Sequence, residues 1–374
     1  MRLWTSPDTS PGDHSPGGRA LARQITAFEA ANPGVVVETR VKRASGVGGL
    51  LDFLRTATSA APAVLPDVIA LSREDLVMAA SEGLVQPLTQ YISPESLSDF
   101  YPLATAAVHS GDVLYGLPFS ADAAVLVYRT EIYAAPPLTW ADVISSTGVY
   151  LIPIGDPSGL ATLQQYQALG GAITDASGKL ALDVPVLEQV LGFYQAAAAA
   201  GVLPPGNGDF LDLAASWIAY REQRAALAVA PATLFLREHD RGGETAATLL
   251  PTRDGARLAL GTAWSYALVT PDPVRRSLAL GLMQWLTAPA NVGEWTAAFG
   301  ALPPRATALD TWADEDLEAF ARQVMSAAIL QPDEAARAAL GPPLRQAAID
   351  VVAGQASPQV AAQRAAVAVA GQSP

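Results

Sequence analysis

The chain has 374 residues, of which 50% are hydrophobic and 16% are charged, and its formal net charge is −13. A chain of this length exceeds one ordinary hydrophobic core, so we expect two lobes. The negative charge argues against a nucleic-acid partner, because nucleic-acid phosphates require a basic surface. The absence of cysteine excludes disulfides, thiolate metal ligands and a cysteine nucleophile.

Strands and helices alternate from the first residues to Gly83. The strands are short apolar runs, and apolar residues recur on one face of the predicted helices. This alternation predicts right-handed crossovers and a mainly parallel sheet covered by helices on both faces. The predicted strands are Arg2 to Thr5, Val35 to Val41 and Asp67 to Leu71, and the predicted helices are Arg19 to Ala31, Gly48 to Ala60 and Ser72 to Gly83.

An acidic residue lies between two apolar segments in the middle of the chain. Val113 to Phe119 and Ala123 to Tyr128 are predicted strands, and Ser120-Ala121-Asp122 joins them. Burying an unpaired carboxylate in a packed core is costly. Asp122 is therefore either the cap of a surface turn or a residue at the point where the chain leaves one lobe for another.

The second half of the chain repeats the alternation and then becomes almost entirely helical. Leu258 to Val269 is predicted to be a long strand that Thr262-Ala263-Trp264-Ser265 interrupts. Alanine-rich helical segments follow Pro271 and Pro273. The other predicted elements are strands at Tyr150 to Ile154 and Ala225 to Ala230 and helices at Gly159 to Leu169, Pro185 to Ala200, Leu211 to Arg221, Thr233 to Asp240, Val274 to Thr287, Ala290 to Phe299, Asp314 to Ala328 and Asp333 to Leu340.

Five stretches, in this order, resemble the extracellular solute-binding proteins, family 1, of ABC importers, the group of maltose-binding proteins. The most recognisable is Leu114-Tyr115-Gly116-Leu117-Pro118-Phe119 with Tyr128-Arg129, at which the chain of these proteins first crosses between lobes. Together the stretches extend over nearly the whole chain. The other four are Phe28 to Val37, Pro66 to Leu88, Gly170 to Asp183 and Ala279 to Arg305.

The resemblance implies an α/β fold of two lobes, each with a mainly parallel sheet flanked by helices, joined by a hinge. The hinge is expected near 120–123 and 261–266. The N-terminal lobe is then predicted to contain 1–121 plus 265–308, and the C-terminal lobe 122–264 plus 309–374.

The resemblance also implies a receptor that captures a small solute by hinge closure, a sugar or oligosaccharide above all. The receptor would deliver this solute to ABC transporter permease subunits, as a monomer, without a cofactor and without enzymatic activity. The alternatives are a polyamine, amino acid or oxyanion receptor of the same fold, or a two-domain enzyme such as a glycosidase, which needs two positioned carboxylates. His14, His109 and His239 are far apart in sequence, so we expect no metal site.

Export to the outside of the cell membrane, with a lipid anchor, is implied by the same resemblance. The cysteine to which such an anchor is attached is absent from the sequence. The chain begins with the strand-like Met1-Arg2-Leu3-Trp4 and no signal peptide. We therefore expect one of two cases. Either the protein is cytosolic, or the sequence begins just after a removed export segment and the protein is located in the periplasm or at the outer face of the cell membrane.

Candidate solute-binding residues lie at or just after the ends of the first and third predicted strands and at both crossings between lobes. Sugars need flat apolar faces and planar polar groups, which aromatic and carboxylate side chains supply. Packing in the sheet explains Trp4 equally well, and helix capping explains Ser72 at least as well. For Trp264, burial under the hinge is the less favoured alternative. The candidates are Trp4, Thr5, Ser6, Ser72, Arg73, Glu74, Phe119, Ser120, Asp122, Trp264, Ser265 and Tyr266.

Two further candidates, Leu160 and Thr233, lie in the predicted C-terminal lobe. They match places at which maltose-binding relatives carry aromatic platforms. Here Leu160 is aliphatic and Thr233 is small. This departure favours a solute smaller than a long maltodextrin, or one of different shape.

Overall fold

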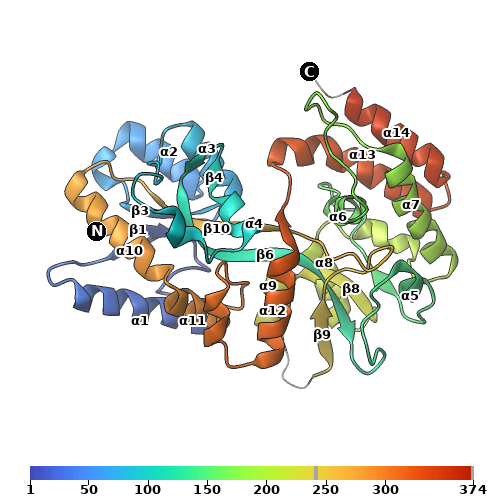
Figure 1. The fold of residues 1–374 in the computed structure, drawn as a ribbon, viewed down its shortest axis with the longest axis horizontal. Coiled ribbons are helices and arrows are strands. Elements are labelled where there is room, and N and C mark those ends of the chain that lie inside the picture. Colours follow the sequence, from blue (N-terminus) through green and yellow to red (C-terminus); the bar gives the residue numbers. More distant parts are fainter. Residues whose placement is uncertain (240–242, 372–374) are drawn as a thin grey trace. The chain divides into compact units, whose positions relative to one another are not determined.

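The computed structural model describes residues 1–239 and 243–371. These residues form two compact units, which Figure 1 shows as ribbons. The first unit consists of Met1–Asp122 and Gly261–Ser326, and the second of Ala123–Leu260 and Ala327–Pro374. The predicted lobes divide the chain at 121/122, 264/265 and 308/309, whereas the units change over at 122/123, 260/261 and 326/327. The third difference arises because nearly all of helix α12 (Glu315–Ala327) belongs to the first unit.

The first unit is built on three parallel strands, beside which two longer strands lie. Strands β1 (Arg2–Thr5), β2 (Glu38–Val41) and β3 (Val68–Ser72) pair in parallel in the order β2-β1-β3. Strand β10 (Ala259–Leu268) pairs with β3 in the antiparallel direction, and β6 (Gly116–Arg129) follows β10 in the order.

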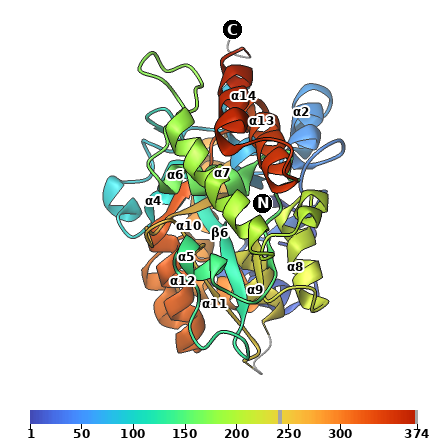
Figure 2. The same ribbon diagram turned by 90° about the vertical axis from the view of Figure 1, so that its right-hand side faces the viewer.

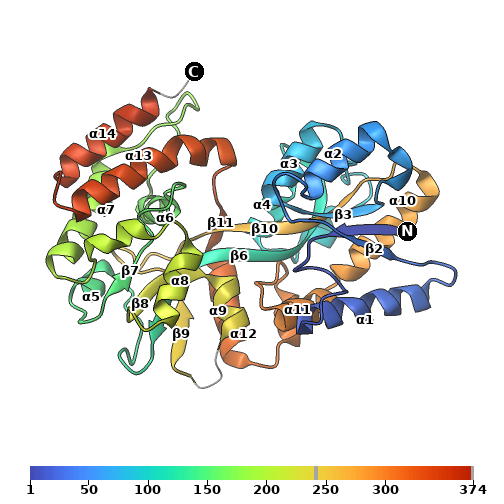
Figure 3. The same cartoon turned by 180° about the vertical axis from the view of Figure 1, so that it is seen from behind.

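Helices cover both faces of this sheet. Figures 1 and 3 show α2 and α3 on one side of β1 and β3, and α1 and α10 on the other. Buried Leu, Ile and Phe side chains of these helices and strands form one continuous hydrophobic core. The bounds are α1 Pro16–Ala31, α2 Leu50–Ala60, α3 Arg73–Ser81, α10 Pro273–Leu286 and α11 Pro289–Phe299.

The second unit has its own core and a mixed sheet. Strand β8 (Leu227–Pro231) pairs in parallel with β7 (Tyr150–Leu151) and antiparallel with the second half of β6, which also pairs with β9 (Thr245–Thr248). Helix α14 packs against both α7 and α13, as Figure 2 shows. The helices are α6 Leu160–Ala168, α7 Val184–Ala199, α8 Leu213–Arg221, α9 Ala232–Glu238, α13 Glu334–Val352 and α14 Pro358–Ala370.

The predicted break at Ser120-Ala121-Asp122 is wrong, because β6 runs through these residues as one strand. The backbone there is hydrogen-bonded: Ala121 N–H donates to Leu302 O (2.9 Å) and Leu302 N–H to Ala121 O (3.2 Å). Strand β10 is likewise uninterrupted at Trp264. Residue types that are uncommon inside apolar strands suggested a break at both places. In the structure, the backbone at both places pairs with a neighbouring segment, so the strands continue.

Helix α13 is longer than predicted. It continues through Pro342 and Pro343 instead of ending at Leu340. Gly341, just before them, lies so close to the loop after β7 that a Cβ there would be 2.1 Å from Pro157 O. The helix therefore packs here on backbone, and Leu340 and Leu344 on either side are fully buried.

The remaining elements are short, and the predicted end of α9 at Asp240 lies outside the described residues. In the part of the chain that the structure describes, no helix is long and apolar enough to cross a membrane. The short elements are α4 Pro102–Ala107, α5 Trp140–Ile144, β4 His109–Ser110, β5 Val113–Leu114 and β11 Ala328–Leu330.

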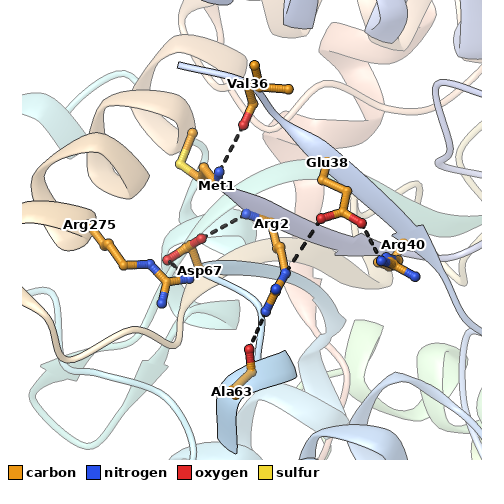
Figure 4. Close-up of polar contacts among 8 residues, drawn as sticks. All are labelled: Met1, Arg2, Val36, Glu38, Arg40, Ala63, Asp67 and Arg275. Carbon is orange, nitrogen blue, oxygen red and sulfur yellow. Dashed lines mark hydrogen bonds and ion pairs between the residues drawn. The ribbon is translucent and has the colours of Figure 1, made fainter. Parts of the chain in front are cut away.

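A buried carboxylate holds the start of the first sheet together (Figure 4). Asp67, just before β3, is fully buried, and its Oδ2 accepts a hydrogen bond from Arg2 N–H (2.7 Å). Arg275 Nη2 of α10 lies 2.8 Å from Asp67 Oδ1, as an ion pair without the alignment of a hydrogen bond. On the exposed side, Arg2 Nε is 3.6 Å from Glu38 Oε2. Asp67 thus joins β1, β3 and α10.

Candidate functional site at the carboxyl ends of the first unit's strands

Three parallel strands of the first unit end at one edge of their sheet. Thr5 is paired with Val41, and Trp4 with Ile69, so the carboxyl ends of β1, β2 and β3 lie next to one another. Ligands of open α/β sheets bind at the carboxyl ends of such strands. The residues directly beyond these ends are Ser6, Lys42 and Arg73.

Strand β10 brings an indole ring to the same edge. Trp264 pairs directly with Ser72, the last residue of β3, although the two are far apart in sequence. Cross-strand partners have neighbouring side chains. Trp264 packs against the core of the first unit but is only partly buried. An aromatic face and the start of α3 therefore lie side by side.

The hydroxyl groups after β1 bond to one another. Thr5 Oγ1 donates to Thr9 O (2.7 Å) and lies 2.6 Å from Thr9 Oγ1. Ser6 Oγ lies 2.9 Å from the same Thr9 hydroxyl. Thr5 and Ser6 are buried. In this structure their first role is to fix the loop that follows β1.

The residues that open α3 are held by hydrogen bonds. Ser72 is the N-cap, and its Oγ accepts from Asp75 N–H (3.2 Å). Arg73 Nη1 donates to two backbone carbonyls, Ala107 O (3.2 Å) and His109 O (2.8 Å). Glu74 lies in the first turn of the helix, where a negative charge is favourable. The Arg73 guanidinium thus ties α3 to the segment after α4.

Three aromatic candidates lie in the core behind the edge. Phe119 and Tyr266 are 1% and 3% exposed, and their rings stack with centroids 4.3 Å apart. Trp295 of α11 meets Phe119 edge-on at 5.5 Å. Trp4 is 4% exposed and belongs to the same core. Burial raises the pKa of the Tyr266 hydroxyl, which stays protonated. These rings support the edge and present no open face to a solute.

Ser265 is also covered. Its side chain points at Gly116 of β6, where a Cβ would come within 2.9 Å of Ser265 Oγ. The glycine of the Leu-Tyr-Gly-Leu-Pro sequence is therefore required for β6 to lie this close to β10. Ser120 and Asp122 lie further along β6, and Asp122 is the last residue of the first unit before the chain passes on.

Lys42 is a candidate that the sequence analysis missed. It directly follows β2, and its backbone N–H donates to Thr5 O (2.9 Å). Its Nζ lies 3.8 Å from the centroid of the Phe53 ring and 5.8 Å from that of Trp4. It is one of only two lysines in the chain, and its position after a predicted strand was the available signal.

Leu160 and Thr233 lie in the second unit, at the starts of helices that follow parallel strands. Leu160 begins α6 after β7, and Thr233 is the second residue of α9 after β8. The sequence analysis missed Asp156 beside Leu160. Its carboxylate accepts from Ser158 N–H (2.8 Å) and Leu160 N–H (3.4 Å), so it fixes the start of α6.

Comparison with known proteins gives a family. Residues 23–321 match the family model for bacterial extracellular solute-binding protein. The chain is 29% identical over 136 residues to the maltotriose-binding protein of Pyrococcus abyssi. That alignment covers 34% of this chain and 30% of the relative, which is less than a third of the relative's length.

Solved structures show the fold. The cyclic α-maltosyl-1,6-maltose binding protein of Arthrobacter globiformis is 18% identical with a TM-score of 0.79, covering 99% of this chain and 98% of that one. The sugar-binding protein MalE of Xanthomonas citri is 19% identical with a TM-score of 0.78, covering 100% and 98%. The predicted two-lobe α/β fold of the maltose-binding group is thereby confirmed.

Proposed function

Because the chain belongs to the bacterial extracellular solute-binding proteins, we propose that it captures a sugar and delivers it to the permease subunits of an ABC importer. The observation that supports a sugar most directly is the pairing of Trp264 with Ser72 at the carboxyl edge of the first unit. An indole ring stacks on a sugar ring, and the start of a helix offers backbone N–H groups to hydroxyls. The relatives named above are described as binding maltotriose and cyclic α-maltosyl-1,6-maltose.

The basic groups near this edge favour a neutral solute over an oxyanion. Arg73 donates hydrogen bonds to two backbone carbonyls, at 3.2 and 2.8 Å. The Lys42 ammonium lies over the Phe53 ring. An oxyanion receptor would need several arginines or helix N-termini aimed at one point. Leu160 and Thr233 offer no aromatic platform, which favours a small sugar over a long chain.

The remaining parts of the proposal concern location, assembly and capture. The family supports a location outside the cell membrane. We further propose that a lipid anchor holds the protein there and that it acts as a monomer without enzymatic activity. Hinge closure captures the solute, since a ligand that gains contacts in one arrangement of a protein shifts the population toward it. Incubation with candidate sugars followed by mass spectrometry separates this from the glycosidase alternative, which would yield cleaved products.

A thermal-shift panel tests the solute class. Maltose, maltotriose, glucose and ribitol represent neutral solutes, spermidine the polyamines, and phosphate and sulfate the oxyanions. We expect at least one neutral sugar to raise the unfolding midpoint in a saturable way, because a ligand that binds only the folded state stabilises it. A rise with spermidine alone would contradict the proposal in favour of a polyamine receptor.

Arg73→Met tests whether the guanidinium serves the fold or the solute. We expect a loss of about 1–3 kcal/mol in unfolding free energy, because two backbone carbonyls lose their charged donor. The dissociation constant for the sugar should change by less than about threefold, or roughly 0.6 kcal/mol. Exposed Arg43→Met is the control for loss of one positive charge. A tenfold weaker affinity in Arg73→Met alone would place this guanidinium against the solute.

A further inference from the structure

The second unit contains a cavity of about 160 Å³ between α8, the end of α9 and β9. Arg129, the last residue of β6, forms part of its wall. Arg129 is six residues beyond Ala123, the first residue of this unit. At roughly 3.3 Å per residue along a strand, about 20 Å separate the two ends. The cavity is therefore remote from the end of β6 at which the chain enters the unit.

Arg129 is a buried cation. It is 9% exposed, and its guanidinium lies 4.7 Å from the centroid of the Tyr220 ring. Nε donates to Ala225 O (3.2 Å) and Nη2 to Tyr220 O (2.7 Å). No carboxylate among the described residues forms an ion pair with it. A desolvated charge without a counter-ion is costly, so this arrangement favours an anion nearby.

The end of α8 compensates the charge only in part. Tyr220 O belongs to the last turn of that helix, which carries about half a negative charge. Capping of this turn explains the hydrogen bond to Tyr220 O, whereas Ala225 lies beyond the helix. Capping does not explain an open space beside a guanidinium in an otherwise close-packed protein interior.

The acidic side chains of the wall do not neutralise Arg129. Glu238 Oε2 accepts from Trp217 Nε1 (2.9 Å) and lies 3.6 Å from Arg221 Nη1. Glu244 is exposed, so water screens its charge. One of the two carboxylates is thus engaged with other partners and the other is solvated.

The other polar groups of the cavity can donate hydrogen bonds. Tyr220 OH donates to Thr245 Oγ1 (3.2 Å), which leaves the Thr245 hydroxyl proton for another acceptor. His239 Nδ1 is buried and has no hydrogen-bond partner among the described residues. Together with Arg129 these groups line a space of about 160 Å³. A water's share of liquid volume is about 30 Å³, so the space is larger than one water requires.

We infer that the cavity lined by Arg129, Tyr220, His239 and Thr245 is a binding site for a small molecule with a carboxylate or phosphate group. The oxyanion pairs with the Arg129 guanidinium and accepts from the Thr245 hydroxyl. The cavity lies in the second unit, whereas the pairing of Trp264 with Ser72, which supports the proposed sugar site, lies in the first. The inference does not depend on the identity of the sugar.

The 374-residue chain can be titrated with sodium phosphate and, separately, sodium acetate, against sodium chloride at equal ionic strength. The indole N–H resonance of Trp217, assigned with Trp217→Phe, reports on the cavity wall. We expect saturable movement with at least one oxyanion and none with chloride. The two titrations distinguish a phosphate from a carboxylate ligand. Arg129→Gln should weaken binding at least about tenfold, because a charge-assisted contact is lost.

Thr245→Val removes the hydroxyl group and keeps the shape of the side chain. This variant tests the inference if Arg129→Gln does not fold. We expect it to weaken oxyanion binding about threefold or more, or at least roughly 0.6 kcal/mol. Exposed Arg224→Gln, in the same unit, is the matched control and should bind as the wild type does. Sugar-induced stabilisation should persist in all three variants. The inference is overturned if neither oxyanion moves the Trp217 resonance, or if both variants bind like Arg224→Gln.

Discussion

Trp264→Ala is expected to abolish the thermal stabilisation that a bound sugar gives, without unfolding the protein. The indole is only partly buried and pairs across the strand with Ser72, so it supplies the open aromatic face at the carboxyl edge. Central aromatic residues of a binding site typically cost 2 kcal/mol or more when truncated, which corresponds to a dissociation constant about 30-fold higher. The measurement is the shift of the unfolding midpoint against sugar concentration.

Trp264→Phe serves as the control for this prediction, since it keeps a flat ring and should retain part of the stabilisation. Asp122→Ala should also remove the stabilisation, because we propose that this carboxylate contacts sugar hydroxyls. The exposed Asp112→Ala, in the turn before β5, should leave it unchanged. Wild-type shifts in both Trp264→Ala and Asp122→Ala would refute the placement of the site.

Arg275→Met is expected to lower the free energy of unfolding by about 3 kcal/mol. It leaves the fully buried carboxylate of Asp67 without its cation, and breaking a buried pair from one side costs about 3–5 kcal/mol. Half of the Arg275 side chain is exposed, so water screens the pair and the lower end of this range applies. Urea unfolding at pH 7 measures the loss.

The neighbouring Arg276→Met is the matched control for the Asp67 pair. Arg276 lies over the Tyr91 ring at 4.9 Å, a contact of about 0.5–1 kcal/mol. Adding Asp67→Asn to Arg275→Met should restore part of the stability, because the amide oxygen can still accept from Arg2 N–H and carries no charge. If Arg275→Met and Arg276→Met lower the free energy of unfolding equally, the ion pair between Arg275 and Asp67 does not stabilise the fold.

Local sequence patterns predicted the elements of the first unit well. The alternation of apolar runs and amphipathic segments places β1 at Arg2–Thr5 as the structure has it. Strand β2 is shorter than predicted and begins at Glu38, because Glu29 of α1 accepts a hydrogen bond from Val37 N–H before it. A contact between a helix and the loop after it is invisible to strand propensity.

Contacts across long sequence separations could not be predicted. Nothing local in the sequence pairs Trp264 with Ser72, and only the family resemblance suggested that both belong to the site. Phe119 and Tyr266 were predicted to contact the solute, but alternation alone does not tell which face of β6 or β10 meets α11. The position of Lys42 over Phe53 requires β2 and α2 to be folded together.

The strand breaks were predicted wrongly from local residue types. Ser120-Ala121-Asp122 reads as a turn by its polar residues, yet the segment is a strand because Leu302 bonds its backbone. Asp122 is thus a residue of a continuous crossing strand, and not a turn cap. Contact of its carboxylate with the solute stays a proposal, which Asp122→Ala tests.

Calorimetric titration of the 374-residue chain with maltotriose, the sugar named for the relative in Pyrococcus abyssi, tests the central claim most directly. If this sugar is the solute, the wild type should give saturable heat for one site, and Trp264→Ala should give none at the same concentrations. The same titration with maltose, glucose and ribitol tests whether the solute is smaller than maltotriose. Absence of binding to every neutral sugar, or equal affinity in the wild type and Trp264→Ala, would contradict the account.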